Sequence, residues 1–152
     1  MSLLTSAVSM TKAMVQIDST DPGTYEKAMA DWIEQQLSDL SNVLITRENV
    51  LPGRPNLMAE IPGPKHLPAL VMICHMDTVV IGDGWTLPPF EAIEKDGKIY
   101  GRGACDMKSG LACCLSAFIM AARTLHARLR KGASNSSVPW MRKTLCAVLK
   151  PA

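Results

Sequence analysis

A histidine and an aspartate stand two residues apart where a strongly apolar segment ends. The stretch LVMICHMDTVV, Leu70–Val80, places His75 and Asp77 after five apolar residues. Side chains two apart in a strand point the same way, and ligands of α/β proteins bind outside the carboxyl ends of strands. Imidazole and carboxylate are ordinary zinc ligands, and a carboxylate beside a ligating histidine can instead orient it. Taken alone, such a pair is weak evidence for a metal site, because it more often caps loop amides.

Asp106 is a second residue that could bind a metal. It lies in GRGACDMKSG, Gly101–Gly110, where glycines allow sharp turns before an apolar helix. An aspartate at this position could cap the helix or bridge two cations, and Lys108 could tune the local charge. These residues alone do not separate the two uses.

Cys74 precedes His75 and raises the alternative of a thiol nucleophile. Adjacent residues of a strand point to opposite faces, so the two side chains could not share the hydrogen bond that activates such a nucleophile. The chain has five cysteines, none of them in a CxxC spacing. This pattern favours reduced cytosolic thiols over a disulfide framework.

The periodicity of the chain predicts the elements that position these residues. Helices are expected over 3–17, 24–40 and 106–125, strands over 42–49, 56–63 and 69–74, and a hairpin turning at Asp96-Gly97. The continuous apolar run 69–74 is typical of a central strand covered on both faces. The expected fold class is α/β, with a mixed, mainly parallel sheet flanked by helices.

Composition excludes several classes of protein. The 152 residues, 47% of them hydrophobic, suit one domain or a piece of one. A net charge of +2 without an early basic run predicts no nucleic-acid partner. The N-terminus lacks the pattern of a signal peptide, and the apolar segment 110–122 is shorter than the roughly twenty residues that cross a bilayer. We expect a cytoplasmic protein without a membrane partner.

In combination, these motifs are specific. A strand ending in HMDTV, followed by GDGWTLPPFEAIEKDGKIYGRGACDMKSG, closely resembles the zinc-dependent aminoacylase and carboxypeptidase family. That family includes acetylornithine deacetylase, succinyl-diaminopimelate desuccinylase and carboxypeptidase G. The turn STDPG, Ser19–Gly23, and the first helices are also similar to its N-terminus. The resemblance covers residues 1–125 and implies the N-terminal part of a zinc-peptidase-like catalytic domain without the dimerisation domain.

The resemblance implies a role for each motif residue. His75 would be a metal ligand, Asp106 a ligand that bridges two metals, and Asp77 the catalytic carboxylate that orients His75. The Asp106-Met107 peptide would be cis, as is common in the family. The cofactor would be one or two zinc ions, for which cobalt or manganese can substitute. The substrate would be an N-acyl amino acid or small peptide, whose amide bond is hydrolysed by a metal-bound water. The family is usually homodimeric.

The chain departs from the family pattern after Leu125. The family has a later Glu-Glu pair, which supplies the general base and a ligand, then a further carboxylate and a distal histidine. Residues 126–152 contain Lys and Arg but no Asp or Glu. We therefore expect a truncated, inactive fragment of a hydrolase. The alternative is a non-catalytic binding or structural fragment with no functional metal site.

A frameshift would explain the change in composition. Trp140-Met141 is encoded TGG-ATG, and another frame reads the Asp codon GAT across this pair. In that frame the codons of Arg142 and Lys143 permit two glutamates. The sequence therefore predicts two parts, 1–125 from a metallopeptidase or deacylase catalytic domain and 126–152 as an unrelated, frameshifted basic tail.

Overall fold

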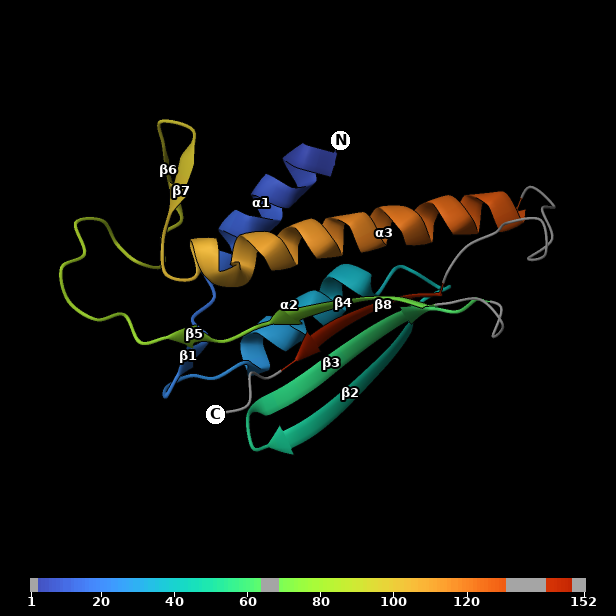
Figure 1. The fold of residues 1–152 in the computed structure, drawn as a ribbon, viewed down its shortest axis with the longest axis horizontal. Coiled ribbons are helices and arrows are strands. Elements are labelled where there is room, and N and C mark those ends of the chain that lie inside the picture. The colour runs from blue at the N-terminus through green and yellow to red at the C-terminus, as the bar shows by residue number, and fades with distance from the viewer. Residues whose placement is uncertain (1–2, 64–68, 131–141, 149–152) are drawn as a thin grey trace.

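The computed structural model describes residues 3–63, 69–130 and 142–148 as two layers, a four-stranded sheet with helices packed on one of its faces (Figure 1). Two short strand pairs, β1 with β5 and β6 with β7, lie apart from this sheet. The elements in chain order are α1 (Leu3–Val15), β1 (Thr20–Asp21), α2 (Lys27–Leu37), β2 (Leu44–Leu51), β3 (Arg54–Ile61), β4 (Ala69–His75), β5 (Thr78–Val79), β6 (Ile93–Lys95), β7 (Lys98–Tyr100), the π-type turn η1 (Ala104–Lys108), α3 (Ser109–Arg130) and β8 (Arg142–Val148).

The helices form where apolar residues recur at three- and four-residue steps, as predicted. The second helix begins at Lys27 rather than Thr24, because Tyr25 has a positive φ of 60° that a right-handed helix does not accommodate. Helix α1 packs along α3, while α2 packs on β3. The core between helices and sheet consists of buried side chains from these elements, among them Met14, Met29, Ile33, Leu37, Leu57, Ala59, Cys74, Leu111, Leu115 and Phe118.

The main sheet has the strand order β2-β3-β8-β4. Strand β8 pairs antiparallel with β3 and parallel with β4. A tight turn at Pro52-Gly53 returns β3 antiparallel to β2. The predicted α/β class and mixed sheet are confirmed. Among the described strands of this sheet, however, parallel pairing is limited to β4 and β8; β2 and β3 are antiparallel through their tight turn, and β3 and β8 are antiparallel although they lie far apart in the chain.

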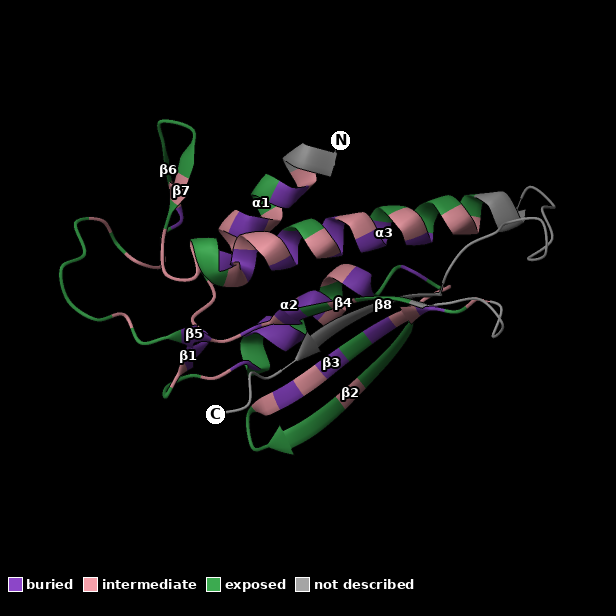
Figure 2. Cartoon of the chain, viewed as in Figure 1, coloured by how far each residue is buried: buried purple, intermediate pink, exposed green. Residues whose placement is uncertain are grey.

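Strand β4 differs from the expected central strand. In the described part of the sheet it is the last strand and pairs with β8 alone. Its inward side chains are Met72 and the buried Cys74, which pack on the core, whereas Val71 and Ile73 are 49% and 68% exposed on the other face. The run 69–74 is therefore covered on one face only by the described residues. Figure 2 shows similarly exposed residues along β2.

Helix α3 is longer than its most apolar segment suggested. Together with η1 it gives the span Ala104–Ala127, which is long and apolar enough to cross a membrane by length and composition alone. The core helix of a soluble protein meets the same criterion. Here Leu111, Leu115 and Phe118 are fully buried in the core, which agrees with the predicted buried helix.

Part of the predicted basic tail lies in regular structure. Helix α3 continues beyond Leu125 to Arg130, and residues 142–148 form β8 between β3 and β4. The predicted boundary at residue 125 separates family-like sequence from a frameshifted tail. It is a statement about the coding sequence, so it stays a prediction. The pair Trp140-Met141 lies outside the described residues.

Candidate metal site

His75 and Asp77 lie on either side of a buried residue where β4 ends. His75 is the last residue of β4, Met76 turns into the core, and Asp77 precedes β5. This alternation places the His75 and Asp77 side chains on the same side of the backbone. Both are largely but not fully buried, with 23% and 15% of their side chains exposed.

Asp106 lies in the irregular turn η1 that leads into α3. Gly103 opens this turn with a φ of +78°, and Asp106 itself has extended dihedral angles of −124° and 102°. The Asp106-Met107 peptide is cis, which confirms the expectation from the family resemblance. The Asp106 carboxylate is 86% exposed. Among the described residues its hydrogen-bonding partner is His75, so the interaction found is with the imidazole and not with a helix amide.

The structure brings all three predicted residues together around one imidazole. His75 Nε2 lies 2.8 Å from Asp106 Oδ1. On the other side of the ring, Nδ1 lies 3.1 Å from the backbone carbonyl oxygen of Asp77 and 3.2 Å from its Oδ1. That Oδ1 is buried, and within the described part of the chain no group forms a well-directed hydrogen bond to it. Asp77 thus faces one ring nitrogen and Asp106 the other.

The two oxygen acceptors around the His75 imidazole favour an additional cation, either a proton or a metal ion. A neutral imidazole carries one proton, yet each of its two nitrogens faces an oxygen acceptor. When Nδ1 donates to Asp77, the lone pair of Nε2 faces the carboxylate of Asp106. A second proton or a metal ion between Nε2 and Oδ1 makes that contact favourable. The donor set, one imidazole nitrogen and one carboxylate oxygen, suits zinc.

The geometry admits a metal with a small adjustment. Two ligands of one tetrahedral zinc ion lie about 3.4 Å apart, compared with the 2.8 Å between His75 Nε2 and Asp106 Oδ1. The Asp106 carboxylate is 86% exposed, so an outward rotation of this side chain would meet solvent rather than protein. No group of three or more His, Cys, Asp or Glu side chains in the described ranges is arranged to hold a metal ion. His75 and Asp106 therefore fit a metal as a partial ligand set.

Lys108 and Cys74, the two neighbours considered with the motif residues, are both buried. Lys108 is buried, and its Nζ donates to the carbonyl oxygen of Ile17 at 2.7 Å. Burial lowers the pKa of Lys108 to about 8, although nearby Asp18 opposes this shift. Cys74 points into the core, where burial and the adjacent Cys114 raise the pKa of its thiol to about 12. A thiol in this state is a poor nucleophile at neutral pH.

Sequence patterns gave no indication of several contacts around the site. Arg102 donates to the carbonyl of Ile81, and its guanidinium lies 5.1 Å from the ring centre of Trp85. Trp85 Nε1 donates to the same carbonyl at 2.7 Å. These contacts hold the loop after β5 against the Gly-Arg-Gly turn. The available signal was the arginine between two glycines, which is too common a pattern to identify a partner 21 residues away.

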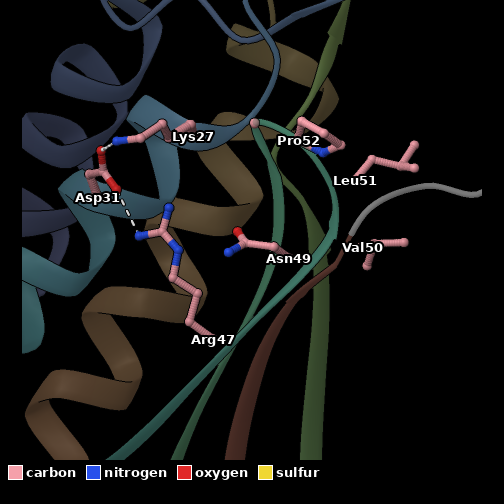
Figure 3. Close-up of a pocket in the computed structure, with 8 residues that line it drawn as sticks. Lys27, Asp31, Arg47, Asn49, Val50, Leu51 and Pro52 are labelled. Carbon is pink, nitrogen blue, oxygen red and sulfur yellow. Dashed lines mark hydrogen bonds and ion pairs between the residues drawn. The ribbon is translucent and has the colours of Figure 1, made fainter.

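An open groove elsewhere on the chain lacks comparable chemistry. It lies between the start of α2 and the β2–β3 turn, has a volume of about 600 Å³ and is shown in Figure 3. Its charged side chains are already paired, because Asp31 accepts from Lys27 at 2.6 Å and from Arg47 at 2.7 Å. The cluster of His75, Asp77 and Asp106 is therefore the stronger candidate site.

Comparison with known protein families identifies one that resembles the part of the chain carrying this cluster. Residues 71–131 match the model of peptidase family M20/M25/M40. The matched range includes His75, Asp77 and Asp106. Through this region the chain is similar to that family, which confirms the resemblance to zinc-dependent aminoacylases and peptidases.

The curated proteins similar to this chain include desuccinylases. A probable succinyl-diaminopimelate desuccinylase from Staphylococcus epidermidis is 39% identical over 99 residues, which cover 62% of this chain and 23% of that protein. A succinyl-diaminopimelate desuccinylase from Nitratiruptor is 53% identical over 55 residues, or 36% of this chain and 15% of that one. The chain thus matches about a quarter or less of the length of these relatives.

Solved structures of the same class share the fold. Aminopeptidase PepT from Bacillus cereus superimposes with a TM-score of 0.66 at 23% identity, covering 95% of this chain and 36% of that one. The dipeptidase Dug1p from Saccharomyces cerevisiae gives 0.69 at 16% identity, with 97% and 32% covered. Human carnosine dipeptidase 1 gives 0.66 at 22% identity, with 93% and 31% covered. These identities establish the likeness of fold.

Proposed function

We propose that this chain carries part of the metal site of a hydrolase that cleaves amide bonds in N-acyl amino acids or small peptides. The observation that carries the proposal is His75, whose two ring nitrogens face Asp77 and Asp106. The desuccinylase relatives and the dipeptidase and aminopeptidase neighbours support this substrate class. Zinc is the proposed metal, as one or two ions, with cobalt or manganese as substitutes.

Each residue of the cluster has a distinct proposed role. His75 would bind the metal through Nε2, and Asp106 would bind it through its exposed carboxylate, bridging to a second ion where two are held. Asp77 would keep the proton of the imidazole on Nδ1, so that Nε2 presents its lone pair. A zinc ion bound there would supply Lewis acidity for the amide carbonyl and a more acidic water.

The general base is the missing part of this proposal. The sequence has no Asp or Glu after Asp106, whereas the family resemblance implies a later Glu-Glu pair. We therefore propose that the 152-residue polypeptide binds metal weakly and does not hydrolyse amides by itself. The activity, cytoplasmic location and homodimeric assembly expected from the family are proposed for the longer proteins that it matches.

A frameshift remains our proposed explanation for the loss of acidic residues. It rests on the composition after Leu125 and on the Asp codon that overlaps Trp140-Met141 in another frame. Strand β8 counts against it, since a frameshifted segment has no reason to form the strand between β3 and β4. The coding DNA decides the matter: codons at Arg142 and Lys143 that do not spell glutamate in the second frame would overturn the proposal.

The direct contact between His75 and Asp106 supports a second candidate function. Their 2.8 Å separation is that of a hydrogen bond, so the cluster could be a structural contact between β4 and η1 in a non-catalytic binding fragment. Cobalt distinguishes the two functions, because Co²⁺ replaces zinc and its visible absorption reports coordination by protein ligands.

The test is a cobalt titration of the full chain, monitored by absorption and by calorimetry. We expect saturable binding that is lost in His75→Ala and in Asp106→Asn. The matched control is His126→Ala, which removes a half-buried histidine of α3 outside the site and leaves binding unchanged. Absence of saturable binding, or equal binding by His75→Ala, would establish the structural contact instead.

A further inference from the structure

The residues Ile17–Thr20, which we call the brace, lie between the two halves of the candidate metal site. One half is the turn His75–Thr78, and the other is the turn Gly103–Lys108. The brace follows α1 and ends in β1, which runs beside β5 as a parallel pair (Figure 1). It includes the start of the STDPG motif, for which the proposed function gives no role.

The brace is bonded to the turn that carries His75 and Asp77. The hydroxyl of Ser19 is fully buried and donates to the carbonyl oxygen of Met76 at 2.7 Å. In return, the amide of Thr78 donates to the carbonyl oxygen of Ser19 at 2.9 Å. Met76 lies between His75 and Asp77, so these bonds fix the backbone from which both side chains project.

The brace is also bonded to the turn that carries Asp106. Lys108 crosses from the end of η1 and donates to the carbonyl oxygen of Ile17 at 2.7 Å, while its aliphatic part is buried. Gly103, at the start of the same turn, packs so closely on Thr78 that a Cβ there would lie 2.5 Å from the threonine methyl group. The three segments therefore contact one another in a closed ring.

The residues just after the brace are bonded to the sheet. Arg54 of β3 donates to Asp21 Oδ2 at 2.6 Å and to Glu26 Oε1 at 2.8 Å. Glu26 is fully buried, and the Arg54 guanidinium lies 4.8 Å from the ring centre of Tyr25. The residues that follow the brace thus have little freedom to move away from the site.

We propose that Ser19 and Lys108 are positioning residues that set the His75–Asp77 turn at the correct distance from Asp106. This inference rests on the proposed metal function. Asp106 needs such support because it has non-helical dihedral angles and an exposed carboxylate, so no regular backbone ladder fixes it. Hydrogen bonds that orient ligands from behind typically change metal affinity by about 10- to 100-fold.

The experiment measures cobalt affinity of the full chain for Ser19→Ala and Lys108→Met. The second variant keeps a buried aliphatic chain and removes the ammonium group, with its bond to Ile17 and its attraction to Asp18. The matched control is Ser116→Ala, which also removes a buried serine hydroxyl with one partner, Met10 Sδ at 3.3 Å, but on α3 away from the site. Circular dichroism and thermal melting accompany each titration.

We expect Ser19→Ala and Lys108→Met to bind cobalt about 10- to 100-fold more weakly than the unchanged chain, with an altered visible spectrum. Ser116→Ala is expected to melt earlier while keeping the affinity and spectrum. If Ser19→Ala does not fold, Lys108→Met carries the test. Affinity and spectrum equal to those of Ser116→Ala would overturn the positioning role. Absence of cobalt binding by the unchanged chain would instead overturn the proposed function, and the inference with it.

Discussion

The Nε2 atom of His75 lies 2.8 Å from Oδ1 of Asp106, although the two residues are 31 positions apart in the chain. This contact joins the end of β4 to the turn before α3. In the proposed metal site, the exposed Asp106 carboxylate therefore already lies close to the more buried imidazole before any metal is bound. Part of the conformational entropy cost of assembling the site is thus met by the fold.

Replacing Asp77 by asparagine tests the orienting role of its carboxylate. Asp77→Asn retains the backbone carbonyl that faces Nδ1 but removes the negative charge beside it. We expect cobalt affinity to fall about 10- to 100-fold, less than the complete loss in His75→Ala. The control is Asp83→Asn, the same change at an exposed position of the next loop. Unchanged affinity in Asp77→Asn would show that the backbone carbonyl alone orients the ring.

An alanine at Gly103 tests the close contact between η1 and β5. The new Cβ would meet the methyl group of Thr78 at 2.5 Å, in a backbone with a φ of +78°. We expect a loss of about 2–4 kcal/mol in the free energy of unfolding, measured by urea denaturation. Gly97→Ala isolates the backbone contribution, since Gly97 has a φ of +71° and open space around it. Equal losses in both variants would show that the Thr78 contact costs nothing.

The two arginines that each contact two carboxylates should differ in importance. Arg54 pairs with the fully buried Glu26, whose hydrogen bond is the main cause that raises the pKa of Arg54. Arg54→Met leaves that carboxylate without its partner and is expected to cost about 3–5 kcal/mol of stability. Arg47 pairs with the more exposed Asp31 and Glu34, so Arg47→Met should cost less than about 1 kcal/mol. Urea denaturation of both variants checks the contrast.

Cysteine reactivity separates the core from the surface. Cys74 is buried and its thiol pKa is raised by burial to about 12, so at pH 8 the thiolate is scarce and inaccessible. Cys105 and Cys113 are exposed. Brief alkylation at pH 8, followed by peptide mass spectrometry, should label Cys105 and Cys113 and leave Cys74 unmodified until the chain is denatured. Labelling of native Cys74 at the rate of Cys105 would contradict the assigned core.

The candidate site residues that could be predicted from the sequence are those that stand in a recognisable short-range pattern. His75 and Asp77 stand at the end of an apolar run, and Asp106 stands between a glycine-rich turn and an apolar helix. Short-range patterns of this kind report local backbone geometry. The helices and the β6–β7 hairpin, which turns at Asp96-Gly97, were predictable for the same reason.

The parts that could not be predicted depend on distant partners. Ser19 bonds a carbonyl 57 residues away and Lys108 one 91 residues away, and no periodicity encodes such a pairing. From the sequence, Lys108 was considered only as a charge near Asp106, and its burial was not predictable because lysine is seldom fully buried. Residues 142–148 had no strand signal strong enough to outweigh the basic composition around them, yet they lie in the sheet.

The position of β8 has a consequence for how this chain acquires its structure during synthesis. The β2–β3 hairpin and β4 have no direct pairing, and the strand that joins them is encoded more than sixty residues after β4. Until a ribosome has delivered residues 142–148, both of these earlier pieces present open strand edges. We therefore expect the sheet to form late, and chaperones that shield strand edges to matter more for the yield of this chain than for that of a protein built from consecutive hairpins.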